Sequence, residues 1–126
     1  MTLLKSADEI AAILKTISQP TRLAILLAIG EGEACVCHLE AILGKRQAYI
    51  SQHLMALRRA DVLLDRRDGR FVYYRIADPS LLGLVRSAGH LAGVDIDVPP
   101  ITTACECPHC SEQKPGYLAL DKADAQ

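Results

Sequence analysis

Residues 35–60 constrain the fold more than any other part of the chain. They hold two helical patterns, over about residues 35–43 and 46–60, separated by a short polar turn with the sequence GKR. Two amphipathic helices joined by so short a turn form a helix-turn-helix. With about 100° of rotation per residue, the second helix has its apolar side chains on one stripe. That stripe consists of Ile50, Leu54 and Leu57.

The face opposite this stripe carries small and hydrogen-bonding side chains. Gln52 lies there, and Ser51 flanks it. Glutamine can pair with adenine through two hydrogen bonds, and a serine hydroxyl can donate or accept one. These residue types predict a helix that reads base edges in a DNA groove. His53 borders the apolar stripe, so it suits either packing or a phosphate contact.

The charge of the chain is unevenly distributed. The net charge is only −1, but residues 45–75 contain eight basic and three acidic side chains, a net charge of +5. The rest of the chain has six basic and twelve acidic residues, a net charge of −6. Such a separation is typical of a protein that binds a polyanion, although a solvated basic face would look similar.

Residues 62–76 read as a β-hairpin. Asp68-Gly69 is a two-residue turn signal, and aromatic and β-branched residues alternate on both sides of it. Arginines at the hairpin tip suggest a wing that grips phosphates or the minor groove. An ordinary hairpin with solvating charges is the alternative. The predicted DNA-binding residues of the helix and the wing are Arg46, Gln47, Ser51, Gln52, His53, Arg58, Arg66, Arg67 and Arg70.

Two further helices are predicted before residue 35. Ser6 and Glu9 have the spacing of a capping box at the start of a helix over residues 6–17. Residues 21–30 are apolar on nearly all sides, which predicts the central buried helix. Half of the chain is hydrophobic but only 4% is aromatic, so the core must be mainly aliphatic. No apolar run approaches the roughly 20 residues of a membrane span, and no cleavable signal follows the N-terminus. A cytoplasmic protein is expected.

The last predicted helix covers residues 79–93 and is capped by Asp78. With residues 6–17 it is the expected dimer surface. A dimer suits a palindromic operator, because each protomer reads one half-site. The fold class is therefore mainly α with a β-hairpin wing, a homodimeric winged helix-turn-helix. We place this domain at residues 1–94 and assign residues 95–126 to a linker and a cysteine-rich tail.

Five cysteines are an odd number, which argues against a closed disulfide framework. Thiolates bind thiophilic ions, so we predict a metal site made from Cys35, Cys37, Cys105, Cys107 and Cys110. The start of a helix favours the thiolate form. On a regular helix, residues i and i+2 point about 200° apart. The first two cysteines can therefore share an ion only if Cys35 lies outside the regular turns or the first turn deforms. Binding would then distort the helix that braces the DNA-reading helix. Two buried packing thiols are the alternative.

Taken together, these motifs resemble the ArsR/SmtB family of metal-responsive repressors over about residues 6–93. CVCHL at 35–39 is similar to the CVCDL of members that respond to arsenic or to cadmium and lead. ISQHL at 50–54 and DGR at 68–70 resemble the recognition helix and the wing. The resemblance implies a homodimeric repressor that leaves its operator when metal binds. Two positions depart from the pattern: Glu40 replaces a third cysteine, and His38 replaces the aspartate. The ligand set therefore remains open, with the tail thiols as candidates.

The inducer also remains open. The CVC context favours As(III), while Cd(II) and Pb(II) accept three or four thiolates, and structural Zn(II) suits the tail with His109. A repressor that responds to thiol oxidation or persulfide formation is an alternative, and so is a DNA-binding protein whose tail zinc is only structural. The C-x-x-C at residues 107–110 would suit a disulfide oxidoreductase, but it lacks the strand-helix context of that enzyme. No enzyme activity is expected.

Overall fold

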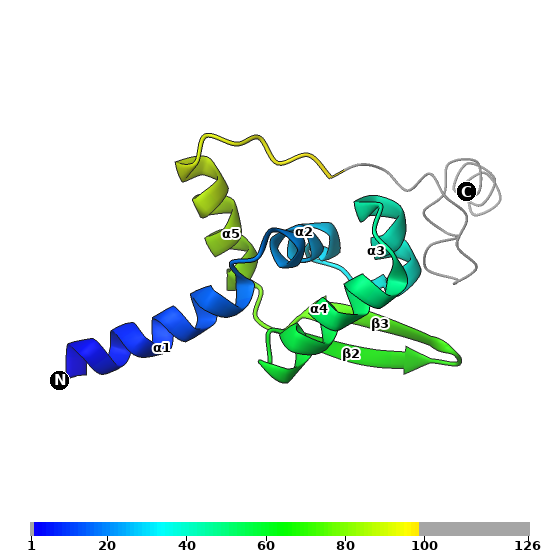
Figure 1. Cartoon of the computed structure of the whole chain (residues 1–126), viewed down its shortest axis with the longest axis horizontal. Coiled ribbons are helices and arrows are strands. Elements are labelled where there is room, and N and C mark those ends of the chain that lie inside the picture. Colours follow the sequence, from blue (N-terminus) through cyan, green and yellow to red (C-terminus); the bar gives the residue numbers. More distant parts are fainter. Residues whose placement is uncertain (1, 99–126) are drawn as a thin grey trace, which may run out of the picture.

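The structure is a computed structural model that describes residues 2–98, and it has the predicted winged helix-turn-helix fold (Figure 1). The prediction of a mainly α chain with a β-hairpin is confirmed. The elements are α1 (Thr2–Ile17), α2 (Pro20–Ile29), β1 (Ala34–Cys35), α3 (Val36–Leu43), α4 (Gln47–Arg59), β2 (Leu63–Asp68), β3 (Phe71–Ile76) and α5 (Ser80–Leu91).

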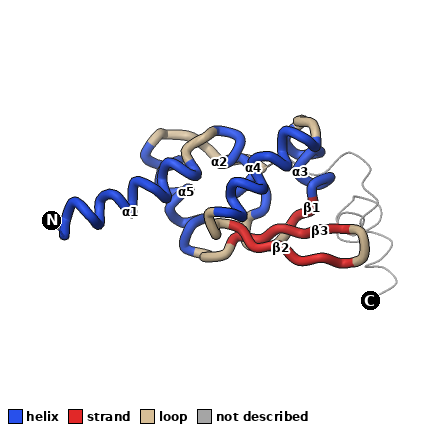
Figure 2. Tube along the Cα trace, turned by 60° about the horizontal axis from the view of Figure 1, so that its bottom comes forward, coloured by secondary structure: helices blue, strands red, loops and turns tan. Residues whose placement is uncertain are grey.

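The strands form one antiparallel sheet in the order β1-β3-β2. The predicted hairpin is β2–β3, and Gly69 lies in its turn with a φ of 62°. The hairpin runs along one side of the helices, and its tip lies at the end of the molecule opposite to α1 (Figure 2). The third strand, β1, was not predicted. It consists of two residues that pair with β3 immediately before α3.

The core is aliphatic, as the composition predicts. Helix α2 is central, and its Ile25 and Leu26 are fully buried. Helices α3 and α4 pack against it through further fully buried side chains, which confirms the apolar stripe predicted for α4. These are Leu39, Ile50, Leu54 and Leu57. Each such side chain stabilises the fold by roughly 1.5–3 kcal/mol through burial.

The predicted start of α1 is wrong. The helix begins at Thr2, so Ser6 lies inside it and forms no capping box with Glu9. The reason is that Leu3, Leu4 and Lys5 are themselves good helix formers, so the helical pattern extends toward the N-terminus.

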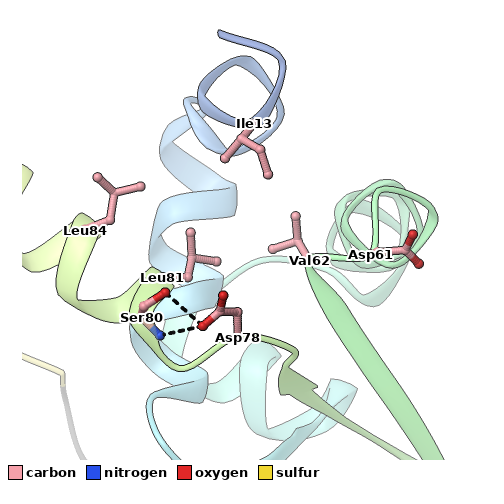
Figure 3. Close-up of a pocket in the computed structure, with 7 residues that line it drawn as sticks. All are labelled: Ile13, Asp61, Val62, Asp78, Ser80, Leu81 and Leu84. Carbon is pink, nitrogen blue, oxygen red and sulfur yellow. Dashed lines mark hydrogen bonds between the residues drawn. The ribbon is translucent and has the colours of Figure 1, made fainter. Parts of the chain in front are cut away.

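The predicted cap of α5 is confirmed. The Asp78 carboxylate accepts hydrogen bonds from the backbone N–H of Ser80, at 3.0 Å, and from its hydroxyl, at 2.8 Å. These bonds hold the pKa of the Asp78 carboxyl below its usual value, the backbone bond contributing most. Figure 3 shows this cap at the edge of a cavity between α1, α5 and the turn after α4.

Helices α1 and α5 leave apolar side chains uncovered. Apart from Ile17, the residues of α1 are exposed or half-buried, and the helix extends away from the body of the molecule (Figure 1). The exposed apolar residues of these two helices are Leu3, Leu4, Ile10, Ile13, Leu14, Leu84 and Leu91. Within residues 2–98, no single helix is long and apolar enough to cross a membrane. Helices α1 and α2 meet the length and composition requirement only as a pair bent by 83°.

Candidate DNA-binding surface and thiol site

Helix α4 presents one face to solvent, as a DNA-reading helix must. The tight turn before it begins at Gly44, whose φ of 65° is in the left-handed region and whose N–H closes α3 by donating to the carbonyl of Glu40. Most of the predicted DNA-binding residues on this part of the chain are exposed, and Ser51 is half-buried. The exposed ones are Arg46, Gln47, Gln52 and Arg58.

His53 differs from the other predicted DNA-binding residues because only 9% of it is exposed. The guanidinium Nε of Arg22 on α2 donates to His53 Nδ1 at 3.1 Å, and the same side chain donates to the Thr16 carbonyl at 2.8 Å. Burial, and then the charge of Arg22, lower the pKa of His53 below its ordinary value. Of the two roles predicted for His53, this geometry favours packing, since the ring ties α4 to α2.

Sequence reasoning missed Tyr49. It is 43% exposed near the start of α4, and its hydroxyl lies 3.1 Å from the hydroxyl of Thr21. Its ring meets the His53 ring edge to face, with centroids 4.9 Å apart. Met55, 50% exposed, also lies on the outer side of α4. The available signal in the sequence was a tyrosine beside, and not on, the Ile50–Leu54–Leu57 stripe, in a chain with only 4% aromatic residues.

The wing arginines have different surroundings. Arg67 and Arg70 are exposed, and the Arg70 guanidinium lies 5.1 Å from the centre of the Phe71 ring. Arg66 instead forms a two-pronged ion pair with the Glu33 carboxylate, in which Nε donates to Oε2 at 2.8 Å and Nη2 donates to Oε1. Its guanidinium also lies 4.5 Å from the centre of the Tyr73 ring. The bond to Glu33 raises the pKa of Arg66 further.

The first two cysteines lie together at the junction of β1 and α3. Cys35 is the residue before the helix, with extended backbone angles (φ −89°, ψ 170°), and Cys37 is in the first turn. The two Sγ atoms are 3.0 Å apart. Cys37 is disulfide-bonded in this structure, whereas Cys35 is not, so an ion could bind both sulfurs only in the reduced protein. Cys35 thus lies outside the regular helical turns, which is the condition predicted for both thiols to reach one ion. Cys35 is only 3% exposed and packs with Tyr73, while Phe71 and Cys37 line the same cluster.

This pair alone does not make a metal site. Within residues 2–98, no group of three or more histidine, cysteine, aspartate or glutamate side chains is arranged to hold an ion. Cys35 and Cys37 supply two sulfur atoms, whereas As(III) favours three thiolates and Zn(II) takes four ligands. The other predicted ligands, Cys105, Cys107 and Cys110, lie outside the described residues.

Comparison with known proteins finds relatives that are all bacterial regulators or repressors. The family model "Bacterial regulatory protein, arsR family" matches residues 19–63. The chain is 37% identical over 83 residues to the biofilm growth-associated repressor of Agrobacterium fabrum, covering 66% of this chain and 71% of that one. It is 44% identical over 66 residues to the arsenical resistance operon repressor of Escherichia coli, covering 52% and 56%.

A solved structure agrees with these sequence matches. The antimony-specific transcriptional repressor AntR superposes with a TM-score of 0.63 at 31% identity, covering 69% of this chain and 79% of that one. The residues matched by the family model include α3 and α4, the helix-turn-helix, and the TM-score shows that the fold is shared with AntR. The chain therefore belongs to the arsR family of bacterial regulatory proteins, the ArsR/SmtB repressors.

Proposed function

We propose that the protein is a cytoplasmic, homodimeric repressor that leaves its operator when a soft ion, As(III), binds Cys35, Cys37 and tail thiolates. One observation carries this proposal: the two Sγ atoms lie 3.0 Å apart at the first turn of α3, the helix that leads directly into α4. A bound ion would fix both sulfurs and so set the geometry at the start of α3. Allosteric coupling of about 1–3 kcal/mol would weaken operator binding by about 5–150-fold.

The choice of As(III) follows from ligand chemistry. Trivalent arsenic binds thiolates, and the pair at 35 and 37 needs further sulfur, which Cys105, Cys107 and Cys110 could supply. Relatives named for arsenical resistance and for antimony support a trivalent, thiophilic inducer. Cd(II) or Pb(II) would use the same ligands. Zn(II) would be structural in the tail.

Dimerisation is proposed from the uncovered faces of α1 and α5. A groove between them is lined by Ser6, Glu9, Ile10, Ile13, Leu14 and Leu84, and its lining is mainly apolar. A second copy of the chain would cover this apolar surface and place two α4 helices to read the two halves of a palindromic operator.

The proposal is tested by operator binding under reducing, anaerobic conditions. Fluorescence anisotropy with a labelled operator would be followed during separate titrations with arsenite, Cd(II), Pb(II) and Zn(II). Near-stoichiometric release by arsenite is expected. Cys37→Ser should bind the operator as the wild type does but remain bound in arsenite. A Cys37→Ser protein that cannot bind DNA without metal would show instead that the thiol is structural.

A second candidate function is a thiol-redox repressor, which the short distance between Cys35 and Cys37 also favours. Two thiols, here or with a tail cysteine, would lose two protons and two electrons to an oxidant such as peroxide and form one disulfide. Peroxide would then release the operator without metal, and a thiol reductant would restore binding. Release by arsenite in fully reduced protein, with no response to peroxide, would exclude this function.

A further inference from the structure

We propose that Arg66, Glu33 and Tyr73 form a latch through which the thiol pair controls the wing. This inference rests on the proposed function and concerns how the thiols reach the DNA-binding surface. It assigns Arg66 a positioning role inside the protein, whereas its sequence context suggested a phosphate contact.

The sheet register puts the thiol site and the wing in one row. Cys35 of β1 is paired with Tyr73 of β3, and Tyr73 is paired with Arg66 of β2. Directly opposed residues on neighbouring strands point to the same face of a sheet, where their side chains meet. Tyr73, only 2% exposed, therefore lies between the buried thiol and the wing arginine.

The ion pair between Arg66 and Glu33 connects the two outer strands of this row, β2 and β1. Glu33 directly precedes β1, and its carboxylate accepts both prongs of the Arg66 guanidinium. Two-pronged arginine–carboxylate pairs fix orientation as well as adding energy. Because the same guanidinium also covers the Tyr73 ring at 4.5 Å, Arg66 is bound at once to the segment before Cys35 and to the middle strand.

Another ion pair on β2 is weaker and provides a comparison. Arg58 of α4 approaches Asp65 with a single contact of 3.9 Å. The Arg58 and Arg66 side chains are similarly exposed (54% and 51%), so the contact geometry distinguishes the two pairs. Such exposed single contacts contribute little to stability. It links the wing to α4 and does not touch the row that contains Cys35.

The latch gives the thiols a mechanical path to the hairpin. In the reduced protein, Cys35 and Cys37 would hold the ion together, and a change in the position of Cys35 would shift β1. Glu33 and Tyr73 move with β1 and β3, and Arg66 transmits the shift to β2 and the wing. Without the latch, the ion would still bind, but the hairpin would keep its DNA-competent position more often.

The test compares Glu33→Gln with the wild type. Glu33→Gln removes the carboxylate charge and preserves side-chain shape, and Asp65→Asn on β2 is the matched control for the weaker ion pair. Operator affinity would be measured with and without saturating arsenite, and arsenite binding would be followed by its ultraviolet thiolate absorbance. The decisive quantity is the ratio of the two operator dissociation constants. Glu33→Gln should lower this ratio by about threefold or more with arsenite binding unchanged, while Asp65→Asn keeps it.

Arg66→Lys guards against a result caused by misfolding, because it retains the charge but not the two-pronged geometry. It should also lower the ratio. If both variants keep the wild-type ratio, or weaken operator binding equally with and without arsenite, the latch has no role and Arg66 acts only at the DNA or in folding. A wild-type protein that arsenite does not release contradicts the proposed function itself, and with it the latch.

Discussion

At the scale of single residues, the burial of His53 and the nearby charge of Arg22 make stability depend on pH. The neutral imidazole accepts from Arg22, and the pKa of His53 in the folded protein is below its ordinary value of 6.5. Between those two pKa values the unfolded chain binds more protons than the folded one. The stabilisation is therefore complete above about pH 6.5 and is lost as the pH falls through this window.

His53→Asn should flatten this part of the pH profile, because asparagine keeps an acceptor near Arg22 but does not titrate. Urea unfolding at pH 7 and at pH 5 would measure the effect. His90→Asn, at an exposed position on α5, is the matched control for the substitution itself. An identical slope in His53→Asn would mean that the slope comes from other groups.

Individual residues also show where sequence reasoning ends. The position of Cys35 outside the helix could be stated as a condition from spacing alone, since two residues on a regular helix cannot share an ion. The partner of Arg66 could not, because Glu33 lies 33 residues away in the chain and only the fold brings the two together. The burial of His53 was undecided for a related reason: its neighbour Arg22 belongs to another helix.

At the scale of elements, α4 and the wing should make different contributions to DNA binding. Gln52 is exposed on α4, whereas Arg67 is exposed on β2. Gln52→Ala should cost about 1–3 kcal/mol against the preferred base pair and so relax sequence preference. Arg67→Ala should weaken binding to all sequences and reduce the salt dependence by about one unit of slope.

Anisotropy with the operator and with a scrambled duplex, each at several salt concentrations, distinguishes these two effects. Each variant is the control for the other. If Gln52→Ala lost affinity equally for both duplexes, α4 would contact the phosphates and would not read bases.

The bounds of helices and strands were predicted most accurately where the apolar repeat in the sequence is long. Helices α2 and α4 have long apolar repeats, and their predicted bounds differ from the structure by a residue or so. Strand β1 has two residues, too few to show any alternation, and it exists only because β3 offers an edge beside it. Helix α1 was predicted four residues too short because the Ser6–Glu9 pattern suggested a start at Ser6, whereas the helix begins at Thr2.

At the scale of the whole molecule, the aliphatic core of residues 2–98 is buried, but many apolar side chains of α1 and α5 remain exposed to solvent. Helix α1 has exposed apolar side chains along most of its length, beside Leu84 of α5. Figure 3 shows Leu84 and Ile13 on either side of the cavity between these helices. Exposed apolar area of this extent is typical of an interface. A second copy is the occupant that the proposed dimeric repressor requires, because each copy would read one half-site of the proposed palindromic operator.

Leu84→Glu should therefore break the dimer, because each interface would bury an unpaired carboxylate beside the apolar groove. Sedimentation should show a monomer. Operator affinity should fall by about 10²-fold or more, since the two half-sites would no longer be bound together. Arg86→Glu puts the same carboxylate at an exposed position about 200° around α5 and should remain dimeric. If Leu84→Glu also sedimented as a dimer with unchanged operator affinity, the apolar faces of α1 and α5 would not form the interface, and the two α4 helices would have to be paired through another surface.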